Sequence, residues 1–140
     1  MKMLKNIEVL FVAGFGPIVR DAASSRKFYS ETLGLEFKED ASGYLYTGEL
    51  GGVKHFALWP LAQAAESCFG TDQWPGNLGM PQAWIEFDVG NIEKATAELK
   101  SQGYQLLVAM RTEPWGQIVT RLLGPEGLLV GITHTPWMRK

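Results

Sequence analysis

VRDAASSRKFYSETLGLEF at residues 19–37 and VGNIEKATAELKSQGYQL at residues 89–106 are two versions of one unit. In each version an apolar strand leads into Asp21 or Asn91, and these residue types commonly cap the N-terminus of a helix. An amphipathic helix comes next in both and ends at a glycine before a new strand begins. Because this strand–helix–strand unit occurs once in each half of the chain, the sequence predicts a duplicated fold.

Composition limits the function classes that the chain can belong to. The 140 residues are 46% hydrophobic and 20% charged, which is typical of one globular domain. The formal net charge is −2, so the chain has no basic surplus that would attract nucleic acid or an anionic membrane. We therefore expect neither nucleic acid nor a membrane among its partners.

The apolar run at residues 7–19 is expected to be a buried strand. It contains Glu8 and Pro17, lacks a small-residue cleavage pattern, and is too short to cross a bilayer. The lone Cys68 cannot form an internal disulfide, so the fold does not depend on an oxidising compartment, and we expect a buried thiol. Both observations favour a cytoplasmic protein.

Hydrophobic periodicity outlines two modules. The pattern predicts helices at about 22–32 and 92–102, a short helix after Pro60, and strands at about 7–19, 44–50, 53–59, 83–89, 104–110, 117–122 and 128–133. Residues 70–81 are rich in Gly, Pro and Asn, which is typical of a connecting segment. We therefore expect one module at about 5–60, a connector at about 61–81 and a second module at about 82–135.

Two motifs give the chain a resemblance to a known family. Val-x-Asp, a helix, Phe-Tyr-x3-Leu-Gly-Leu at 19–35, and Leu-Leu-Gly-Pro-Glu-Gly-x-Leu-x-Gly-Ile at 122–132 are similar to the vicinal oxygen chelate superfamily. That superfamily includes glyoxalase I, extradiol dioxygenases and the bleomycin- and mitomycin-resistance proteins. The resemblance implies an α+β fold of paired βαβββ modules, whose curved mixed sheet surrounds a ligand cleft, commonly within a homodimer.

Enzymes of this superfamily hold a divalent metal through one side chain from the first and one from the last strand of each module. The resemblance places three of these positions at Gly14, Trp84 and Gly131, and the remaining one near residues 56–57, next to His55. Glycine and tryptophan side chains cannot coordinate a metal, whereas His, Glu and Gln can. We therefore expect no metal and no cofactor.

Polar residues near these positions leave three interpretations open. His55 together with Glu86 could hold a metal weakly, although two protein ligands are fewer than the three or four usual for zinc. Both residues could instead be polar anchors in the cleft. They could also be ordinary strand residues, because a shift of one residue in the strand would turn His55 to the other face.

Tryptophan is abundant, with five in the chain. The resemblance implies that Trp59, Trp84, Trp115 and also Trp74 could rim the cleft, whereas Trp137 is expected at an interface or in a docked tail. Indole rings stack on flat ligands and donate one N–H hydrogen bond. Packing in the core or in a dimer interface is the alternative for each of them.

One short segment and two arginines are further candidates for ligand contacts. The segment 113–117 is similar to the Trp-Gly-Gln stretch of mitomycin-resistance proteins, in which an aromatic residue helps to form the ligand site. Arg111 and Arg121 could each neutralise an acidic ligand group, and the alternative for both is a surface ion pair.

These observations predict a metal-independent binder of a small aromatic or conjugated molecule, of the antibiotic-sequestering type. The expected ligand-binding residues are His55, Trp59, Trp84, Glu86, Trp115 and Arg121. The alternative is a lyase, isomerase or dioxygenase of the same superfamily, either metal-dependent or using Glu86 or His55 as a base. Bound metal would distinguish the binder from the metal-dependent enzyme.

Overall fold

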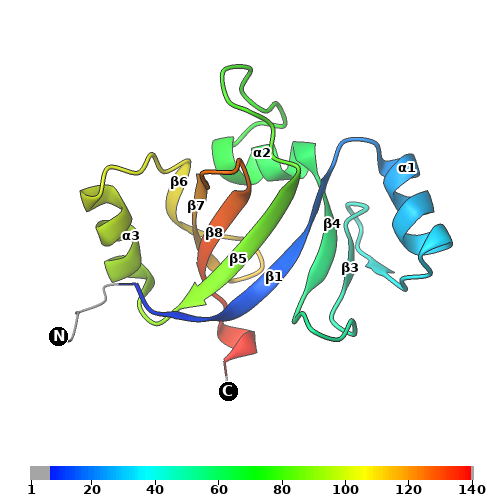
Figure 1. The fold of residues 1–140 in the computed structure, drawn as a ribbon, viewed down its shortest axis with the longest axis horizontal. Helices are drawn as coiled ribbons and strands as arrows, with labels where there is room; N and C mark the ends of the chain where they lie inside the picture. Colours follow the sequence, from blue (N-terminus) through cyan, green and yellow to red (C-terminus); the bar gives the residue numbers. More distant parts are fainter. Residues whose placement is uncertain (1–6, 140) are drawn as a thin grey trace.

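The chain forms one mixed sheet of eight strands in the order β2-β3-β4-β1-β5-β8-β7-β6 (Figure 1). The structure is a computed structural model that describes residues 7–139. Its elements are β1 (Val9–Val19), α1 (Ala22–Arg26), η1 (Lys27–Thr32), β2 (Lys38–Glu39), β3 (Leu45–Thr47), β4 (Phe56–Pro60), α2 (Leu61–Phe69), β5 (Ala83–Val89), α3 (Ile92–Ser101), β6 (Val108–Thr112), β7 (Ile118–Leu123), β8 (Leu129–His134) and η2 (Pro136–Met138).

The sheet order repeats the duplication in the sequence. In each half, the first strand lies beside the last strand and parallel to it, as β1 does to β4 and β5 to β8. The two halves meet where β1 and β5 pair antiparallel at the centre. The prediction of an α+β fold built from paired βαβββ modules is therefore confirmed.

Both predicted helix caps are present. The Asp21 side chain accepts a hydrogen bond from the Ser24 backbone N–H at 3.1 Å, and the Asn91 side chain accepts one from Lys94 at 3.0 Å. The first helix is less regular than expected, because α1 passes directly into the wider π-helical turn η1. Each cap satisfies a backbone N–H that would otherwise have no partner at the start of the helix.

Three predicted strands are shorter in the structure than expected. The hairpin expected at 44–50 and 53–59 consists of the short strands β3 and β4, joined by a loop in which Gly52 has a φ of +90°. The strand expected to begin at residue 104 begins only at Val108 in β6. The pairing of β6 with β7 is irregular up to Arg111, and Met110 within β6 has a positive φ of 56°. The apolar pattern of the sequence does not show this irregularity, so it placed the start of the strand too early.

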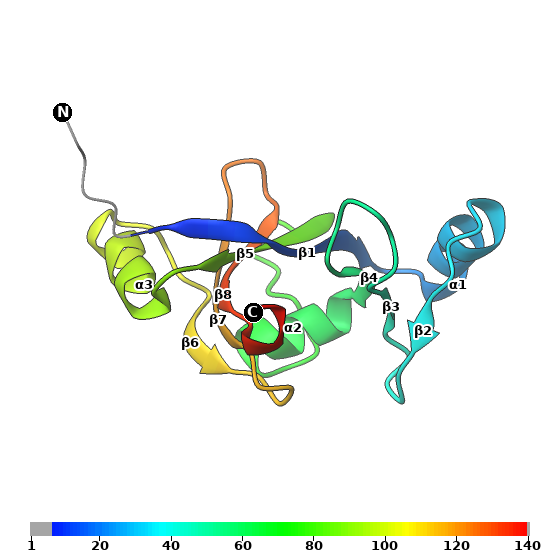
Figure 2. The same ribbon diagram turned by 90° about the horizontal axis from the view of Figure 1, so that it is seen from below.

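The helices cover different parts of the sheet. In Figure 2, α1 and α3 lie at its two ends, whereas α2 and the C-terminal turn η2 lie on one side of the central strands. Helix α3 supplies Ile92 and Ala95 to one buried cluster, and α2 supplies Ala64 and Cys68 to another that also contains Trp84. None of the described helices is long and apolar enough to span a membrane.

Candidate functional site

A cleft of about 460 Å³ lies between the central strands, α2 and η2. It is bounded by Trp84 and Glu86 of β5, Gln63 of α2, and Trp137 and Met138 of η2. Much of the wall is aromatic, and beside the His55 imidazole six tyrosine and tryptophan rings line it: Tyr44, Tyr46, Trp59, Trp84, Trp115 and Trp137. Such a mostly apolar cavity with a few polar groups is typical of small-molecule sites.

All six residues that the sequence indicated for ligand contacts line this one cleft. They are His55, Trp59, Trp84, Glu86, Trp115 and Arg121. Their contact with a ligand stays a prediction, but the strands of both modules bring them together. Trp74 lies elsewhere, in a shallower depression beside Met80, and its indole N–H donates to the Gly79 carbonyl at 3.1 Å.

The four tryptophans of the cleft differ in burial. Trp59 and Trp84 are buried, whereas Trp115 and Trp137 are 53% and 51% exposed. Of the two positions expected for Trp137, the docked tail agrees with the structure, because Thr135 and Arg139 on either side of it bond to Asp88. The turn η2 also brings Trp137 to the rim of the cleft, which was not expected. The cleft therefore has two fixed indoles at its base and two solvent-exposed indoles at its edge.

Trp84 belongs to the core as well as to the cleft. Its indole N–H donates to the Ala57 carbonyl at 3.3 Å, and its ring meets the Trp59 ring edge-on with the centroids 5.9 Å apart. Trp84 is 3% exposed. Trp84 therefore packs in the core, which is one of the two alternatives from the sequence, and it also lines the cleft, whereas its stacking on a ligand stays a prediction.

His55 faces the cleft, and the next residue, Phe56, packs on the opposite side of β4 against Phe15. The His55 Nε2 atom lies 2.8 Å from the Tyr44 hydroxyl, and the ring stacks against Tyr46 with the centroids 5.7 Å apart. Burial lowers the pKa of His55, although the charge of Glu86 opposes this. His55 is therefore a neutral, hydrogen-bonded group in the cleft.

The residues at the family's metal positions do not fit a metal. A Cβ atom on Gly14 would lie 2.8 Å from the Trp84 ring, and a Cβ on Gly131 would lie 2.9 Å from Glu86 Cγ and 3.1 Å from Arg121 Nη1. The space next to both glycines is thus filled by other side chains. Within residues 7–139, no three His, Cys, Asp or Glu side chains are grouped as a metal would require.

His55 and Glu86, the alternative pair of metal ligands, already form hydrogen bonds with other side chains. Glu86 Oε1 accepts a hydrogen bond from Gln117 at 3.0 Å, and its Oε2 accepts one from Arg121 at 2.9 Å. The His55 Nε2 is engaged by Tyr44. Coordination by this pair would have to break several of these interactions.

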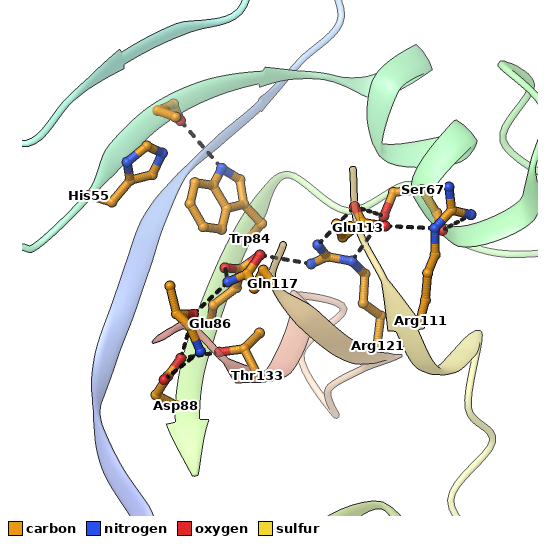
Figure 3. A network of polar contacts seen from close by, with 12 residues as sticks. His55, Ser67, Trp84, Glu86, Asp88, Arg111, Glu113, Gln117, Arg121 and Thr133 are labelled. Carbon is orange, nitrogen blue, oxygen red and sulfur yellow. Dashed lines mark hydrogen bonds and ion pairs between the residues drawn. The ribbon is translucent and has the colours of Figure 1, made fainter. Parts of the chain in front are cut away.

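A buried polar network extends from Glu86 and Arg121, which line the cleft, to Arg111, which does not (Figure 3). Arg121, which is 1% exposed, donates from Nη1 to Glu86 and from Nε to Ser67 Oγ at 3.2 Å. Ser67 in turn donates to Glu113 Oε2 at 3.0 Å, and Arg111 Nε forms an ion pair with Glu113 Oε1 at 2.6 Å. The network therefore alternates two guanidinium groups with two carboxylates.

Arg121 also packs against the aromatic wall. Its guanidinium carbon lies 4.8 Å from the centroid of the Trp59 ring, within the range of a cation–π interaction. The alternative of a surface ion pair is wrong for Arg121, because its ion pair with Glu86 is buried. Arg111 is not among the residues that line the cleft, and it pairs with Glu113 on the more exposed side of the network.

Gln117 is the main polar connector at the rim, and sequence reasoning missed it. Its side-chain oxygen accepts from the Trp115 indole at 3.0 Å, and its nitrogen donates to Glu86 and to Thr135 Oγ1 at 2.8 Å. Tyr44 and Tyr46 were also missed. Their spacing of two residues, which places two rings on one face of a strand, was the available signal.

The C-terminal turn is fastened by Asp88, which has no exposed surface. Its carboxylate accepts from Thr133 Oγ1 at 2.6 Å, from Thr135 N and Oγ1 at 2.9 and 2.7 Å, and from Arg139 Nε at 3.0 Å. Burial alone would raise the pKa of Asp88, but the hydrogen bonds from Thr133 and Thr135 hold it below its ordinary value. Asp88 therefore positions the segment that carries Trp137.

Cys68 is buried in α2, as the sequence predicted. Burial raises the pKa of its thiol to about 11. A thiol with this pKa is protonated near neutral pH and is a poor nucleophile. The burial of Cys68 in a core cluster indicates that its side chain contributes to packing.

Comparison with known proteins agrees with the fold. Residues 15–132 match the family model described as "Glyoxalase/Bleomycin resistance protein/Dioxygenase superfamily". The chain belongs to this superfamily. A comparison with curated proteins finds no match.

Two solved structures illustrate the similarity of the fold. A superfamily member from Vibrio splendidus 12B01 is 17% identical with a TM-score of 0.60, covering 92% of this chain and 99% of its own. A variant of Streptomyces coelicolor methylmalonyl-CoA epimerase, solved in complex with 2-nitronate-propionyl-CoA, is also 17% identical, with a TM-score of 0.56 and the same coverage. At this identity the likeness concerns the fold alone.

Proposed function

We propose that this chain is a metal-independent binder of a small aromatic or conjugated molecule, of the antibiotic-sequestering type. The observation that carries the proposal is the cleft itself, with six aromatic rings around about 460 Å³. Stacking on such rings combines burial of apolar surface with favourable ring contacts of about 0.5–1.5 kcal/mol per pair. The side chains at the family's metal positions support a metal-independent site.

Titration of the indole fluorescence tests binding directly. Flat aromatic and conjugated compounds are added to the purified protein, and we expect saturable quenching by those that fit the cleft. Elemental analysis of the same sample is expected to find well below one Ni, Zn, Fe or Mn per chain. About one metal per chain, lost when His55 or Glu86 is substituted, would contradict the proposal.

The second candidate function is an enzyme that moves a proton with Glu86 or His55 as base. One similar fold belongs to a methylmalonyl-CoA epimerase, and both residues line the cleft here. Against it, Glu86 already accepts hydrogen bonds from Gln117 and Arg121. Incubation of a bound ligand in D2O separates the two functions, because a binder returns it unchanged whereas a proton-transfer enzyme incorporates deuterium.

We also propose that the protein acts in the cytoplasm as a homodimer. Support for a dimer comes from apolar side chains exposed on β1, among which Val12 and Phe15 are 39% and 40% exposed. In Figure 2 none of the described helices covers the outer side of β1 and β5 between α1 and α3. A buried, unpaired Cys68 is consistent with a reducing compartment.

A further inference from the structure

The lining of the cleft carries one negative charge that no neighbouring side chain balances. Its charged residues are Asp40, Glu86 and Arg121, and the last two form a buried ion pair at 2.9 Å. Asp40 is exposed and forms no ion pair with another side chain of residues 7–139. The side-chain hydrogen bond from Ser42 holds the pKa of Asp40 below its ordinary value, so this carboxylate is charged near neutral pH.

The turn between β2 and β3 presents two free oxygen atoms at one edge of the cleft. Ser42 Oγ donates to Asp40 Oδ1 at 2.6 Å and accepts from Gln63 Nε2 at 3.2 Å, and all three residues line the cleft. The backbone N–H groups of Ser42 and Tyr44 donate to the same Oδ1 atom, and Gln63 Nε2 also donates to the Ser42 carbonyl. Within the described part of the chain, Asp40 Oδ2 and Gln63 Oε1 have no hydrogen-bond partner. In Figure 2 this turn lies on the same side of the sheet as α2 and η2.

Aromatic faces belong to the same cleft as this edge. Tyr44 directly follows the turn, and its ring is nearly parallel to that of Tyr46, with the centroids 5.6 Å apart. Trp115 and Trp137, the exposed indoles of the rim, also line the cleft. Because the face of an aromatic ring is negative, it attracts a cation. The rings and the carboxylate of Asp40 therefore favour the same sign of ligand charge.

We infer that the aromatic ligand of this cleft is a protonated amine, whose ammonium group donates a hydrogen bond to Asp40 Oδ2, with Gln63 Oε1 as a second acceptor at the same edge. The inference rests on the proposed binding function and deepens it by naming the charge of the ligand. Hydrogen bonds between a charged donor and a carboxylate are roughly twice as strong as those between neutral groups. A ligand carboxylate would instead be repelled by Asp40. Asp40 is therefore the residue that selects cations among flat aromatic compounds.

Three probes on one aromatic skeleton test the inference in the unaltered protein. 2-Naphthylmethylammonium carries a positive charge, 2-ethylnaphthalene has the same shape without a charge, and 2-naphthoate carries a negative charge. We expect the ammonium to bind about tenfold more tightly than ethylnaphthalene, as a charge-assisted hydrogen bond implies. Naphthoate is expected to bind more weakly than either. Added NaCl should narrow the preference for the ammonium, because salt screens exposed charges.

Substitution then assigns the preference to Asp40. Asp40→Asn keeps the size of the side chain and an oxygen that can accept from Ser42 and Tyr44, but it removes the charge. The ratio of ammonium to ethylnaphthalene affinity is expected to fall at least about fivefold in this variant. Asp72→Asn is the matched control, because Asp72 is also exposed but does not line this cleft, and the ratio should persist there.

The outcomes separate the inference from the proposed function. Tightest binding of ethylnaphthalene or of naphthoate, or an unchanged ratio in Asp40→Asn, would overturn the inference while leaving an aromatic binder intact. Failure of all three probes and of larger aromatic compounds to bind would overturn both. If Asp40→Asn does not fold, the three affinities in the unaltered protein still decide the charge of the ligand.

Discussion

Two glycines at the centre of the sheet show how single residues shape this site. At Gly14 and Gly131 the space for a side chain is taken by Trp84 and by the Arg121–Glu86 pair. The glycines are therefore required by the groups that pack over them. The aromatic and ionic base of the cleft exists because two positions carry no side chain.

This packing makes Gly131→Ala a sensitive substitution. The added Cβ would meet Glu86 Cγ at 2.9 Å and Arg121 Nη1 at 3.1 Å, and Glu86 Cγ is not a free end that can easily move away. We expect a loss of about 1–3 kcal/mol in the free energy of unfolding, measured by urea denaturation, together with weaker binding of flat aromatic compounds in the fluorescence titration. Gly76→Ala is the control, since nothing lies within 4 Å of its Cβ, and an equal loss there would refute the packing argument.

Substitutions of Trp84 and Trp115 should have different effects, the first mainly on the free energy of unfolding and the second mainly on ligand affinity. Trp84 is buried in the core, so Trp84→Ala is expected to cost about 3–5 kcal/mol of stability. Trp115 is 53% exposed, so Trp115→Ala should cost about 1 kcal/mol or less in denaturation yet weaken ligand binding by about 1–2 kcal/mol. Unchanged affinity in Trp115→Ala would show that the rim indole is not part of the site.

His55 should make stability depend on pH. Because burial lowers its pKa in the folded state, the unfolded chain binds the proton more readily. The free energy of unfolding should therefore fall as the pH drops below about 6.5, until the lower folded pKa is reached. Urea denaturation between pH 5 and 7.5 should show a smaller dependence of the unfolding free energy on pH for His55→Gln than for the unaltered protein, and an equal dependence would contradict this role of His55.

At the scale of elements, periodicity and capping residues predicted the parts of the fold that depend on local sequence. The bounds 83–89 of β5 and the caps Asp21 and Asn91 were correct, because alternation and cap residues are local signals. The short length of β3 and the late start of β6 were not predicted correctly, because pairing with neighbouring strands decides where a strand begins and ends. Sequence alone could place the six cleft residues on strands and loops but could not give the Arg121–Glu86 pairing across β8, which depends on register.

The turn η2 is expected to depend on Asp88. Asp88→Asn keeps the shape of the side chain but removes the negative charge of the carboxylate that accepts hydrogen bonds from Thr133, Thr135 and Arg139. We therefore expect the free energy of unfolding to fall by about 1–3 kcal/mol. Amide hydrogen exchange at Thr135 should accelerate, and ligand affinity should fall because Trp137 is less firmly held. Asp72→Asn is the surface control. Unchanged exchange at Thr135 in Asp88→Asn would mean that other contacts hold the turn.

At the scale of the whole molecule, the two faces of the sheet have different roles. One side carries the cleft with α2 and η2, whereas the outer side of β1 and β5 has none of the described helices over it (Figure 2). Exposed apolar side chains on β1 include Val9, Val12 and Phe15, the first of them 54% exposed. An apolar strand at the centre of an uncovered sheet face is a typical contact between identical subunits.

The last prediction concerns assembly through this outer face. If β1 forms the contact, light scattering at micromolar concentration should report a dimer, and Val12→Glu with Phe15→Glu should give a monomer because two buried like charges would be placed in the contact. Leu33→Glu, at a position 55% exposed beyond η1, is the control and should leave the dimer intact. The cleft lies on the other side of the sheet, with α2 and η2, so the monomeric variant should still bind the flat aromatic compounds that quench the indole fluorescence. A double variant that remains a dimer, or an unaltered protein that is a monomer, would show that the apolar surface of β1 has another role.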